Sequence, residues 1–425
     1  CRDIAYVYNF REPDRPRVLY FHAGQAAVFK KKIHQLVENL KMTIKIRLDS
    51  GTFKEQRDEI VAVIEEQENR QLSQFESLLS KEGFQIVYVQ EGEGQATDIM
   101  PVFHGQPVTF EQLHKHISTG ELSEEEWNEY REKYYRHMDE MKRIFTDLRS
   151  ARATMEEELE ALQNDTARPA ITAEVEVLRR EFSDPPVLTY LDELEEDLTE
   201  NLYLFMLDRQ LTDELGNPKF IRYGVNVIED CSASGTSFPV LFENHPSYAN
   251  LFGNIDVRME GGGESRTSFM MIQAGSLIKA SGGFLIINTA DLFREQDSYE
   301  HLKRALLSGK VEIQHQQGPY SCPGSLVKPE PIEIDVKVIL IGEPGTYDEL
   351  YAQDSDFQKL FKVHAEFSDV MGRTEDAMVQ YVRLIHEFVR ENDFRQMEDS
   401  GTAAVLEYGV RLAEDKEKLS TRFSR

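Results

Sequence analysis

Residues 273–292, QAGSLIKASGGFLIINTADL, decide the fold of this chain of 425 residues. A Gly-Ser turn and a Gly-Gly pair lead into the apolar run 284–287, which ends in the polar residues Asn288, Thr289 and Asp291. An unbroken apolar run of this length is typical of a parallel strand buried on both faces. Open α/β sheets bind ligands at the carboxyl ends of such strands. We therefore expect functional side chains where this run ends.

A second apolar run follows about fifty residues later along the chain. Residues 336–343, VKVILIGE, come after the Pro-rich segment 327–331 and end in Glu343. This pattern predicts another buried strand, again with a polar residue at its carboxyl end. The two runs together favour an α/β fold with a parallel sheet.

The two runs and their surroundings resemble the ATPase region of Lon-related AAA+ proteases. Residues 273–292 are similar to the family's Walker B strand, and residues 336–343 are similar to its sensor strand. Further similar segments lie at residues 5–16, 222–227, 250–255, 357–374 and 408–423. The last of these contains LSTRF, which resembles the sensor-2 element of the family's helical lid.

The resemblance implies an α/β AAA+ core of the P-loop type followed by part of a helical lid. It implies ATP and Mg²⁺ as cofactors, a homo-oligomeric ring, and unfolded protein as the substrate of a Ser-Lys peptidase. The phosphate-loop pattern G-x-x-x-x-G-K-[ST] does not occur in the chain. We expect that loop before residue 1 and the peptidase after residue 425, so the chain alone is expected to be inactive.

The resemblance also assigns roles at the end of the first run. In the family, two acids there hold magnesium and orient the attacking water, but this chain has Asn288 and Thr289. Asn288 and Asp291 are the candidate Mg²⁺ residues, and Asp291 is also a candidate for hydrolysis. Two alternatives stay open. For Asp291, the alternative role is to cap the next helix. For the whole protein, the alternative is a degenerate scaffold or adaptor that binds nucleotide and hydrolyses it slowly or not at all.

The remaining candidate residues come from the same resemblance. Glu343 is the sensor-1 candidate, with a structural hydrogen bond as the alternative. Lys362 and Arg373 are candidates for the arginine finger, which stabilises charge in the transition state of phosphoryl transfer. Arg422 is the sensor-2 candidate, and a surface arginine is the alternative. Asn288, Thr289, Glu343 and Arg422 are thus the expected nucleotide-binding residues.

A long helical segment separates the two ends of the expected core. The residues Trp127, Tyr130, Tyr134, Met138, Met141, Phe145 and Leu148 recur every three or four positions, as in a coiled coil. Leucines in 191–202 offer a partner helix, residues 57–80 a third helix, and residues 83–103 a small β-hairpin.

This helical segment is expected to engage substrate, or else to act as a spacer or oligomerisation arm. The expected domains are 1–27 (core), 28–215 (helical insertion), 216–374 (core) and 375–425 (partial lid).

Composition limits the partners and the compartment. Acidic residues outnumber basic ones 76 to 48, for a net charge of −28, so we expect no nucleic acid among the partners. No apolar run approaches the length of about eighteen residues that a membrane span requires. The three cysteines are scattered without metal-binding spacing, which favours reduced thiols and a cytoplasmic location.

Overall fold

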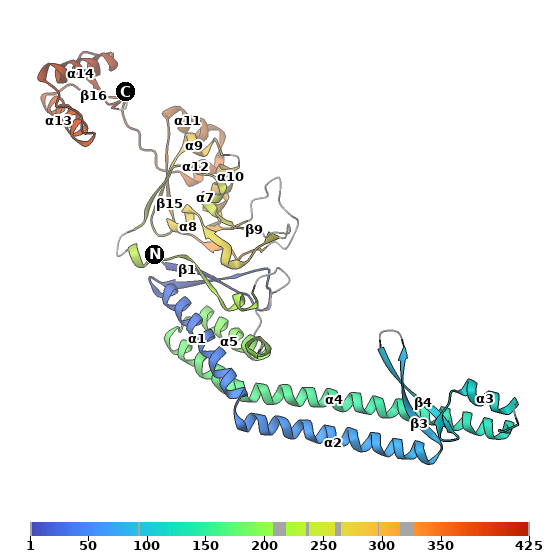
Figure 1. Ribbon diagram of the computed structural model, residues 1–425. Helices are drawn as coiled ribbons and strands as arrows, with labels where there is room; N and C mark the ends of the chain where they lie inside the picture. The colour runs from blue at the N-terminus through green and yellow to red at the C-terminus, as the bar shows by residue number, and fades with distance from the viewer. Residues whose placement is uncertain are drawn as a thin grey trace. The chain divides into compact units, whose positions relative to one another are not determined.

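The computed structural model describes residues 2–91, 94–118, 120–206, 218–234, 238–259, 265–295, 297–314 and 327–423. The chain forms two compact units (Figure 1). The first contains Cys1–Ile287 and Gly309–Ile339, and the second contains Asn288–Ser308 and Leu340–Arg425. The division passes through two strands, β12 and β15, so that the carboxyl ends of these strands belong to the second unit.

A three-stranded antiparallel sheet with the order β2-β1-β6 opens the first unit. Its strands are β1 (Arg2–Val7), β2 (Arg17–His22) and β6 (Val225–Glu229). Asp3, on β1, is fully buried and accepts hydrogen bonds from the N–H groups of Ala26 (3.0 Å) and Cys231 (2.8 Å). Because Ala26 lies in the first turn of the following helix, this buried carboxylate satisfies a helix N–H that lacks a partner within the helix.

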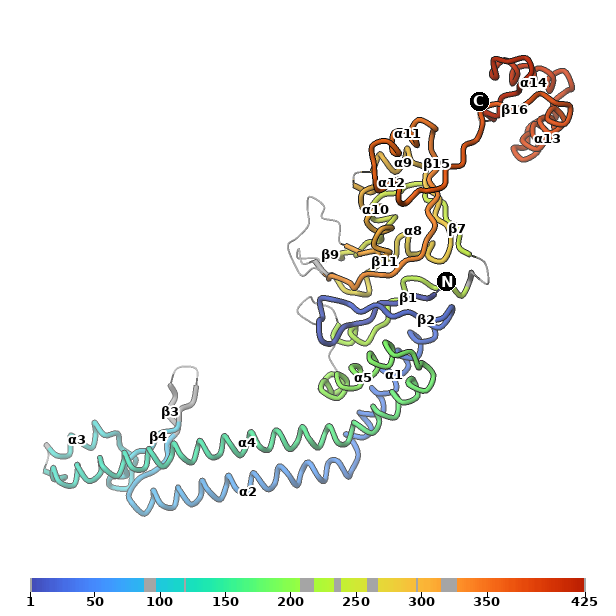
Figure 2. The backbone as a smooth tube through the Cα atoms, turned by 180° about the vertical axis from the view of Figure 1, so that it is seen from behind, coloured from blue at the N-terminus to red at the C-terminus, as the bar shows by residue number. Residues whose placement is uncertain are grey.

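Long helices follow β2, as the periodic pattern predicts. They are α1 (Gln25–Leu48), α2 (Gly51–Lys81), α3 (Phe110–Ser118), α4 (Glu124–Glu181), α5 (Pro185–Glu200) and α6 (Tyr203–Met206). α2 and α4 lie side by side in both views (Figures 1 and 2), and Arg152 donates to Glu68 across them at 2.9 Å. Among the helices described, none combines the length and apolarity of a membrane span.

The predicted hairpin and the helix over 57–80 are confirmed. α2 covers that whole stretch, and β3 (Phe84–Glu91) pairs antiparallel with β4 (Gly94–Phe103), which in turn pairs with β5 (Gln106–Pro107). Phe84 and Ile99 from the hairpin form a small core with Phe75 and Leu79 of α2 and Met141 of α4. The hairpin is therefore held against the two long helices by apolar burial.

The aromatic stripe of α4 has a different partner from the one expected. Tyr130, Tyr134 and Met138 pack against the α2–hairpin core, whereas the leucines of α5 pack on the later part of α4, around Ile171 and Val175. Phe145, within the stripe, is 38 % exposed. Helical spacing shows which residues share a face, and the partner of that face depends on where the chain turns.

The residue 273–292 region builds a second sheet, with the order β15-β12-β7. Its strands are β7 (Val240–Glu243), β12 (Phe284–Asn288) and β15 (Lys337–Ile341). β12 and β7 run parallel, as predicted. The prediction that this strand is buried on both faces is wrong. Leu285 and Ile287 are fully buried, while Phe284, Phe242 and Ile339 are 40 to 54 % exposed. The exposed positions alternate with the covered ones, so only one face of this sheet is fully covered.

Two glycines of the opening stretch are required by close backbone approach. A Cβ on Gly275 would lie 2.4 Å from the carbonyl oxygen of Leu251, and one on Gly283 would lie 2.0 Å from that of Pro239. Both distances are shorter than any real Cβ contact. The pattern G-S-x-x-x-x-x-G-G therefore serves packing around the start of β12.

Short elements complete the first unit around this sheet. They are η1 (Lys219–Tyr223), η2 (Cys231–Ser234), α7 (Tyr248–Phe252), β8 (Gly253–Ile255), β9 (Arg258–Met259), β10 (Ser265–Arg266), η3 (Phe269–Met271), β11 (Ile272–Ala274), α8 (Ser276–Lys279), β13 (Lys310–Val311) and β14 (Ile332–Glu333). β8 pairs with β11, β9 with β10, and β13 with β14, all antiparallel. Phe269, in η3, is only 4 % exposed, and the neighbouring loop 260–264 lies outside the described residues.

The second unit is mainly helical. Its elements are α9 (Thr289–Leu292), α10 (Ser298–Ser308), α11 (Pro344–Gln353), α12 (Ser355–Leu360), β16 (Val370–Gly372), α13 (Glu375–Glu391), α14 (Asp399–Leu412) and β17 (Lys418–Ser420). β16 pairs antiparallel with β17. Leu419, in the LSTRF segment, is fully buried, and Phe423 packs on Tyr381 with ring centroids 5.3 Å apart.

Candidate functional site

The carboxyl end of β12 places Asn288 at the start of a helix. Asn288 is the N-cap of α9, and its side-chain oxygen accepts a hydrogen bond from the N–H of Ala290 at 2.9 Å. Asn is among the preferred residues for this position because its side chain satisfies an N–H that the helix leaves free. One lone-pair direction of the amide oxygen is therefore already used.

Thr289 links the ends of two strands. It is 6 % exposed, and its hydroxyl donates to the carbonyl oxygen of Ile341, the last residue of β15, at 3.1 Å. The adjacent Gly342 has no room for a side chain, because an added Cβ would lie 2.4 Å from the Thr289 Oγ1. The structure thus brings Thr289 and the 341–343 segment together through a structural hydrogen bond.

The two carboxylates near these strand ends have different surroundings. Asp291, in the first turn of α9, forms an ion pair with Arg294 at 3.0 Å. Glu343 is exposed at the N-cap of α11 and makes no side-chain capping hydrogen bond. Asp291 does not cap a helix, which removes the alternative considered for it from sequence: Asn288 does so instead.

Glu243 is a strand-end residue that the sequence analysis missed. It ends β7, in parallel register with Ile287 of β12. Its carboxylate accepts the N–H of His245 at 2.9 Å and the hydroxyl of Ser276. The signal was present in residues 240–243, VLFE, because this short apolar run also ends in a polar residue.

The three cationic candidates lie along the later part of the second unit. Arg422 forms an ion pair with Asp369, and its pKa is raised by that hydrogen bond. The guanidinium of Arg373 donates to the carbonyl oxygen of Lys416 at 3.3 Å. Lys362 is exposed. Among the described residues, no hydrogen bond or ion pair joins any of these three to the ends of β12 and β15.

A second polar cluster in this unit is centred on Asp354. Its carboxylate accepts from Tyr299 (2.7 Å), Lys303 (2.8 Å) and the N–H groups of Asp356 (2.9 Å) and Phe357 (3.2 Å). Burial opposes ionisation, but the hydrogen bonds from Lys303 and Tyr299 outweigh it and lower the pKa of Asp354. This cluster caps α12 and ties it to α10.

Within the described ranges, no group of three His, Cys, Asp or Glu residues is placed to hold a metal ion. Cys231 is disulfide-bonded; the other two cysteines, Cys1 and Cys322, lie outside the described residues. The disulfide corrects the expectation of reduced thiols, which rested on sequence spacing that does not report three-dimensional proximity.

Three family models match the chain. Residues 236–368 match the LonB-like AAA domain, residues 3–36 the Lon-like LonC helical domain, and residues 396–425 the archaeal LonB AAA+ ATPase lid domain. The first match spans β7, β12 and β15, so this part of the chain is similar to an AAA domain. All three models are of Lon-related AAA+ proteins, which confirms the resemblance seen in the sequence.

The matched segments agree with the observed elements. Residues 3–36 contain β1, β2 and the first half of α1, and residues 396–425 contain α14 and β17. The AAA family assignment implies use of ATP. None of the curated proteins compared with the chain gives a significant match.

Proposed function

We propose that the chain is the AAA+ module of a Lon-like ATP-dependent serine protease. In the full-length protein it would bind nucleotide, assemble into a homo-oligomeric ring and pass unfolded polypeptide to a Ser-Lys peptidase. The observation that carries this proposal is the combined match of core and lid to Lon-related models. The adjacency of β12 and β15, with polar residues at their ends, supports it.

Magnesium fits poorly at the described strand ends. Mg²⁺ is usually bound through one or two carboxylates together with substrate phosphates and water. Here the Asn288 oxygen accepts from Ala290, the Thr289 hydroxyl donates to Ile341, and Asp291 is paired with Arg294. These residues therefore do not fit a metal-activating set, and no catalytic step is assigned to them.

The same observation favours a second candidate function. A degenerate AAA+-like scaffold or adaptor would keep the fold and the lid, hydrolyse ATP slowly or not at all, and bind protein partners through the helices α1 to α5. The structural hydrogen bonds of Asn288 and Thr289 support this alternative, because these two uncharged side chains already use hydrogen-bonding groups within the protein and supply no negative charge to a metal ion.

The variant Asn288→Asp separates the two functions. Asp caps a helix about as well as Asn, so the change adds a negative charge without removing the cap. ATP turnover and ATP-dependent casein degradation would be measured on the full-length protein. The control is Asn288→Ser, which keeps a capping side chain and adds no charge.

The two functions predict opposite results. An ATP-driven protease degrades casein only when ATP is present, and the unmodified protein already hydrolyses ATP at a readily measured rate. A degenerate scaffold shows negligible turnover, which rises at least tenfold in Asn288→Asp and stays unchanged in Asn288→Ser. Casein degradation that does not depend on ATP in any variant contradicts the first proposal.

A further inference from the structure

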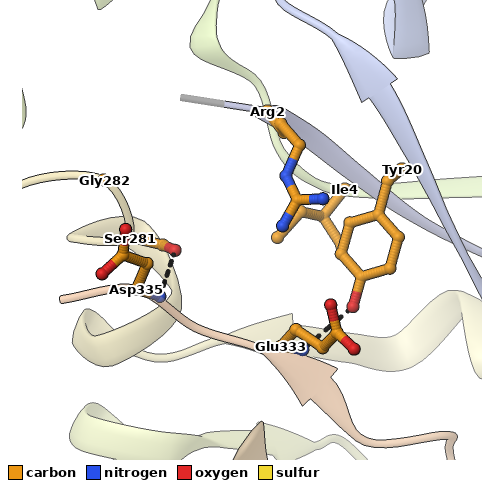
Figure 3. A pocket seen from close by; sticks show the side chains of 7 residues that line it. All are labelled: Arg2, Ile4, Tyr20, Ser281, Gly282, Glu333 and Asp335. Atoms are coloured by element: carbon orange, nitrogen blue, oxygen red, sulfur yellow. Dashed lines mark hydrogen bonds between the residues drawn. The ribbon is translucent and has the colours of Figure 1, made fainter. Parts of the chain in front are cut away.

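A cavity of about 190 Å³ lies within the first unit (Figure 3). Its walls come from β1, β2, the turn before β12, and the segment that joins β14 to β15. Three charged residues line it: Arg2, Glu333 and Asp335. Figure 3 shows Arg2 and Glu333 on two sides of the space, close to the Tyr20 ring, and Asp335 at its edge beside Ser281.

Hydrogen bonds hold the walls of this cavity together. The Tyr20 hydroxyl accepts the N–H of Glu333 at 2.9 Å, and Ser281 Oγ accepts the N–H of Asp335 at 3.1 Å. The N–H of Gly282 donates to the carbonyl oxygen of Asp335 at 2.6 Å. All three bonds use backbone groups of the lining segments, so the carboxylates remain available. A site with fixed walls loses less entropy when a ligand binds.

The charged side chains of the cavity have no ionic partners. Within the part of the chain that the structure describes, neither Arg2, Glu333 nor Asp335 forms an ion pair, whereas the nearby Arg17 is paired with the buried Glu193 at 3.0 Å. The Arg2 guanidinium lies 4.8 Å from the centroid of the Tyr20 ring. All three side chains are exposed, and the cavity therefore presents two negative charges and one positive charge that form no ion pair with any described residue.

We propose that this cavity binds a basic amino acid, a small molecule with one carboxylate and two cationic groups. The ligand's charges complement those of the walls. A guanidinium can bind a carboxylate through two parallel hydrogen bonds. The guanidinium of Arg2 would bind the carboxylate of the ligand in this way. Glu333 and Asp335 receive the α-ammonium and the side-chain cation.

The apolar part of the ligand also has a counterpart. Ile4 and Tyr20 line the cavity, and the ring of Tyr20 is only partly buried, so a methylene chain has this ring to lie against. The net charge of −28 on the whole chain attracts a cationic ligand over a neutral or acidic one. The proposal is independent of the ATP chemistry proposed above.

Calorimetric titration of the chain with a matched ligand series tests the proposal. L-Arginine and L-lysine are expected to bind. L-Citrulline, which has the shape of arginine without its charge, and L-glutamate are expected to bind at least tenfold more weakly. A result in which arginine and lysine show no binding at millimolar concentration, or bind no better than citrulline, would overturn the proposal.

Substitutions locate the site. Asp335→Asn and Glu333→Gln are each expected to weaken arginine binding at least tenfold. Arg2→Gln should weaken the binding of arginine and not that of arginine methyl ester, which lacks the carboxylate. The control is Glu55→Gln, at an exposed position on α2, which makes the same change in charge as Glu333→Gln. Unchanged binding in all three cavity variants contradicts the proposed location.

A readout of folding accompanies the titrations. A ligand that binds only the native state raises the unfolding temperature, so arginine should raise it for the unmodified chain and for Glu55→Gln and not for Asp335→Asn. If a cavity variant fails to fold, the ligand series on the unmodified chain still decides whether a basic amino acid is recognised.

Discussion

The ends of β12 and β15 and the Arg2–Asp335 cavity use polar residues in opposite ways. At the strand ends, Asn288 and Thr289 have hydrogen-bond partners within the protein. In the cavity, the backbone groups are bonded and the charged side chains have no ionic partners among the described residues. The family resemblance pointed to the first region, and the unsatisfied charges point to the second.

This difference separates polar groups that stabilise the fold from polar groups that are available to bind a ligand. A polar group whose hydrogen bonds are made within the protein stabilises the fold and offers little to a ligand. A charged group held in place without a partner adds little to stability and is available for binding. The contrast predicts large stability effects in the second unit and small ones at the cavity.

The largest effect is expected for Asp354→Ala. The change leaves Lys303, which is 8 % exposed, without its second carboxylate partner and removes the cap of α12. Removing one partner of a largely buried ion pair typically destabilises by about 3 kcal/mol. Urea unfolding measures the loss. The exposed Asp348→Ala on α11 is the control, and an equal loss in both would remove the special role of Asp354.

The same carboxylate predicts a dependence on pH. Its pKa is lowered in the folded protein, so its contribution is fully present above the unfolded pKa of about 3.9. The contribution falls gradually below that pH and is lost as the pH passes through the lower pKa of the folded state. The difference in unfolding free energy between the unmodified chain and Asp354→Asn should be constant from about pH 7 to pH 5 and shrink below about pH 4. A difference that does not shrink at all between pH 5 and pH 3 would assign the stabilisation to packing.

Gly342→Ala should have the next largest effect. The added Cβ would lie 2.4 Å from Thr289 Oγ1, and overpacking of this kind costs about 1–3 kcal/mol. The Thr289→Ala background should relieve most of that loss, whereas Thr289→Ser, which keeps the hydroxyl, should not. A double-mutant cycle measures the coupling, and additive effects would show that the two strand ends do not constrain each other.

Removal of the Asn288 cap should have a moderate effect. Asn288→Ala is expected to destabilise by about 1 kcal/mol, while Asn288→Asp and Asn288→Ser stay close to the unmodified protein. Asp291→Ala removes an exposed ion pair and should lose less, about 0–1 kcal/mol. If Asn288→Ala were neutral in thermal unfolding, the structural account of this residue would be wrong.

The smallest effects on stability belong to the cavity. Asp335→Asn and Glu333→Gln should each change the unfolding free energy by less than about 0.5 kcal/mol, the range usual for surface positions without specific interactions. The same variants should lose at least tenfold in arginine binding. A destabilisation of 1 kcal/mol or more, about twice the usual surface range, would place these carboxylates in the structural class.

Local sequence patterns predicted much of the fold. The apolar runs at 284–287 and 336–343 lie on neighbouring strands, and the helix over 57–80 and the hairpin after it form as expected. These features depend on residues within one turn or one strand of each other, which is the range over which periodicity reports. The proposed domain boundaries and the roles of Lys362, Arg373 and Arg422 remain predictions.

Burial and pairing were less predictable. The 284–287 run is as apolar as a strand covered on both faces, yet Phe284 is 40 % exposed. The aromatic stripe of α4 meets α2 and the hairpin rather than α5. Both outcomes depend on which distant segment packs on a given face of the strand or helix, and the spacing of residues along the chain does not predict that.

The sequence by itself determined the resemblance to Lon-related AAA+ proteins, the position of the longest helices and of two central strands, and the replacement of two expected acids by Asn288 and Thr289. Only the tertiary structure decided what those residues do, because the Thr289 hydroxyl meets Ile341, a residue 52 positions away. It likewise brought Arg2 into one cavity with Asp335. Chemical type and periodicity are local properties of a chain, whereas the partner of a polar group is set by packing between distant segments.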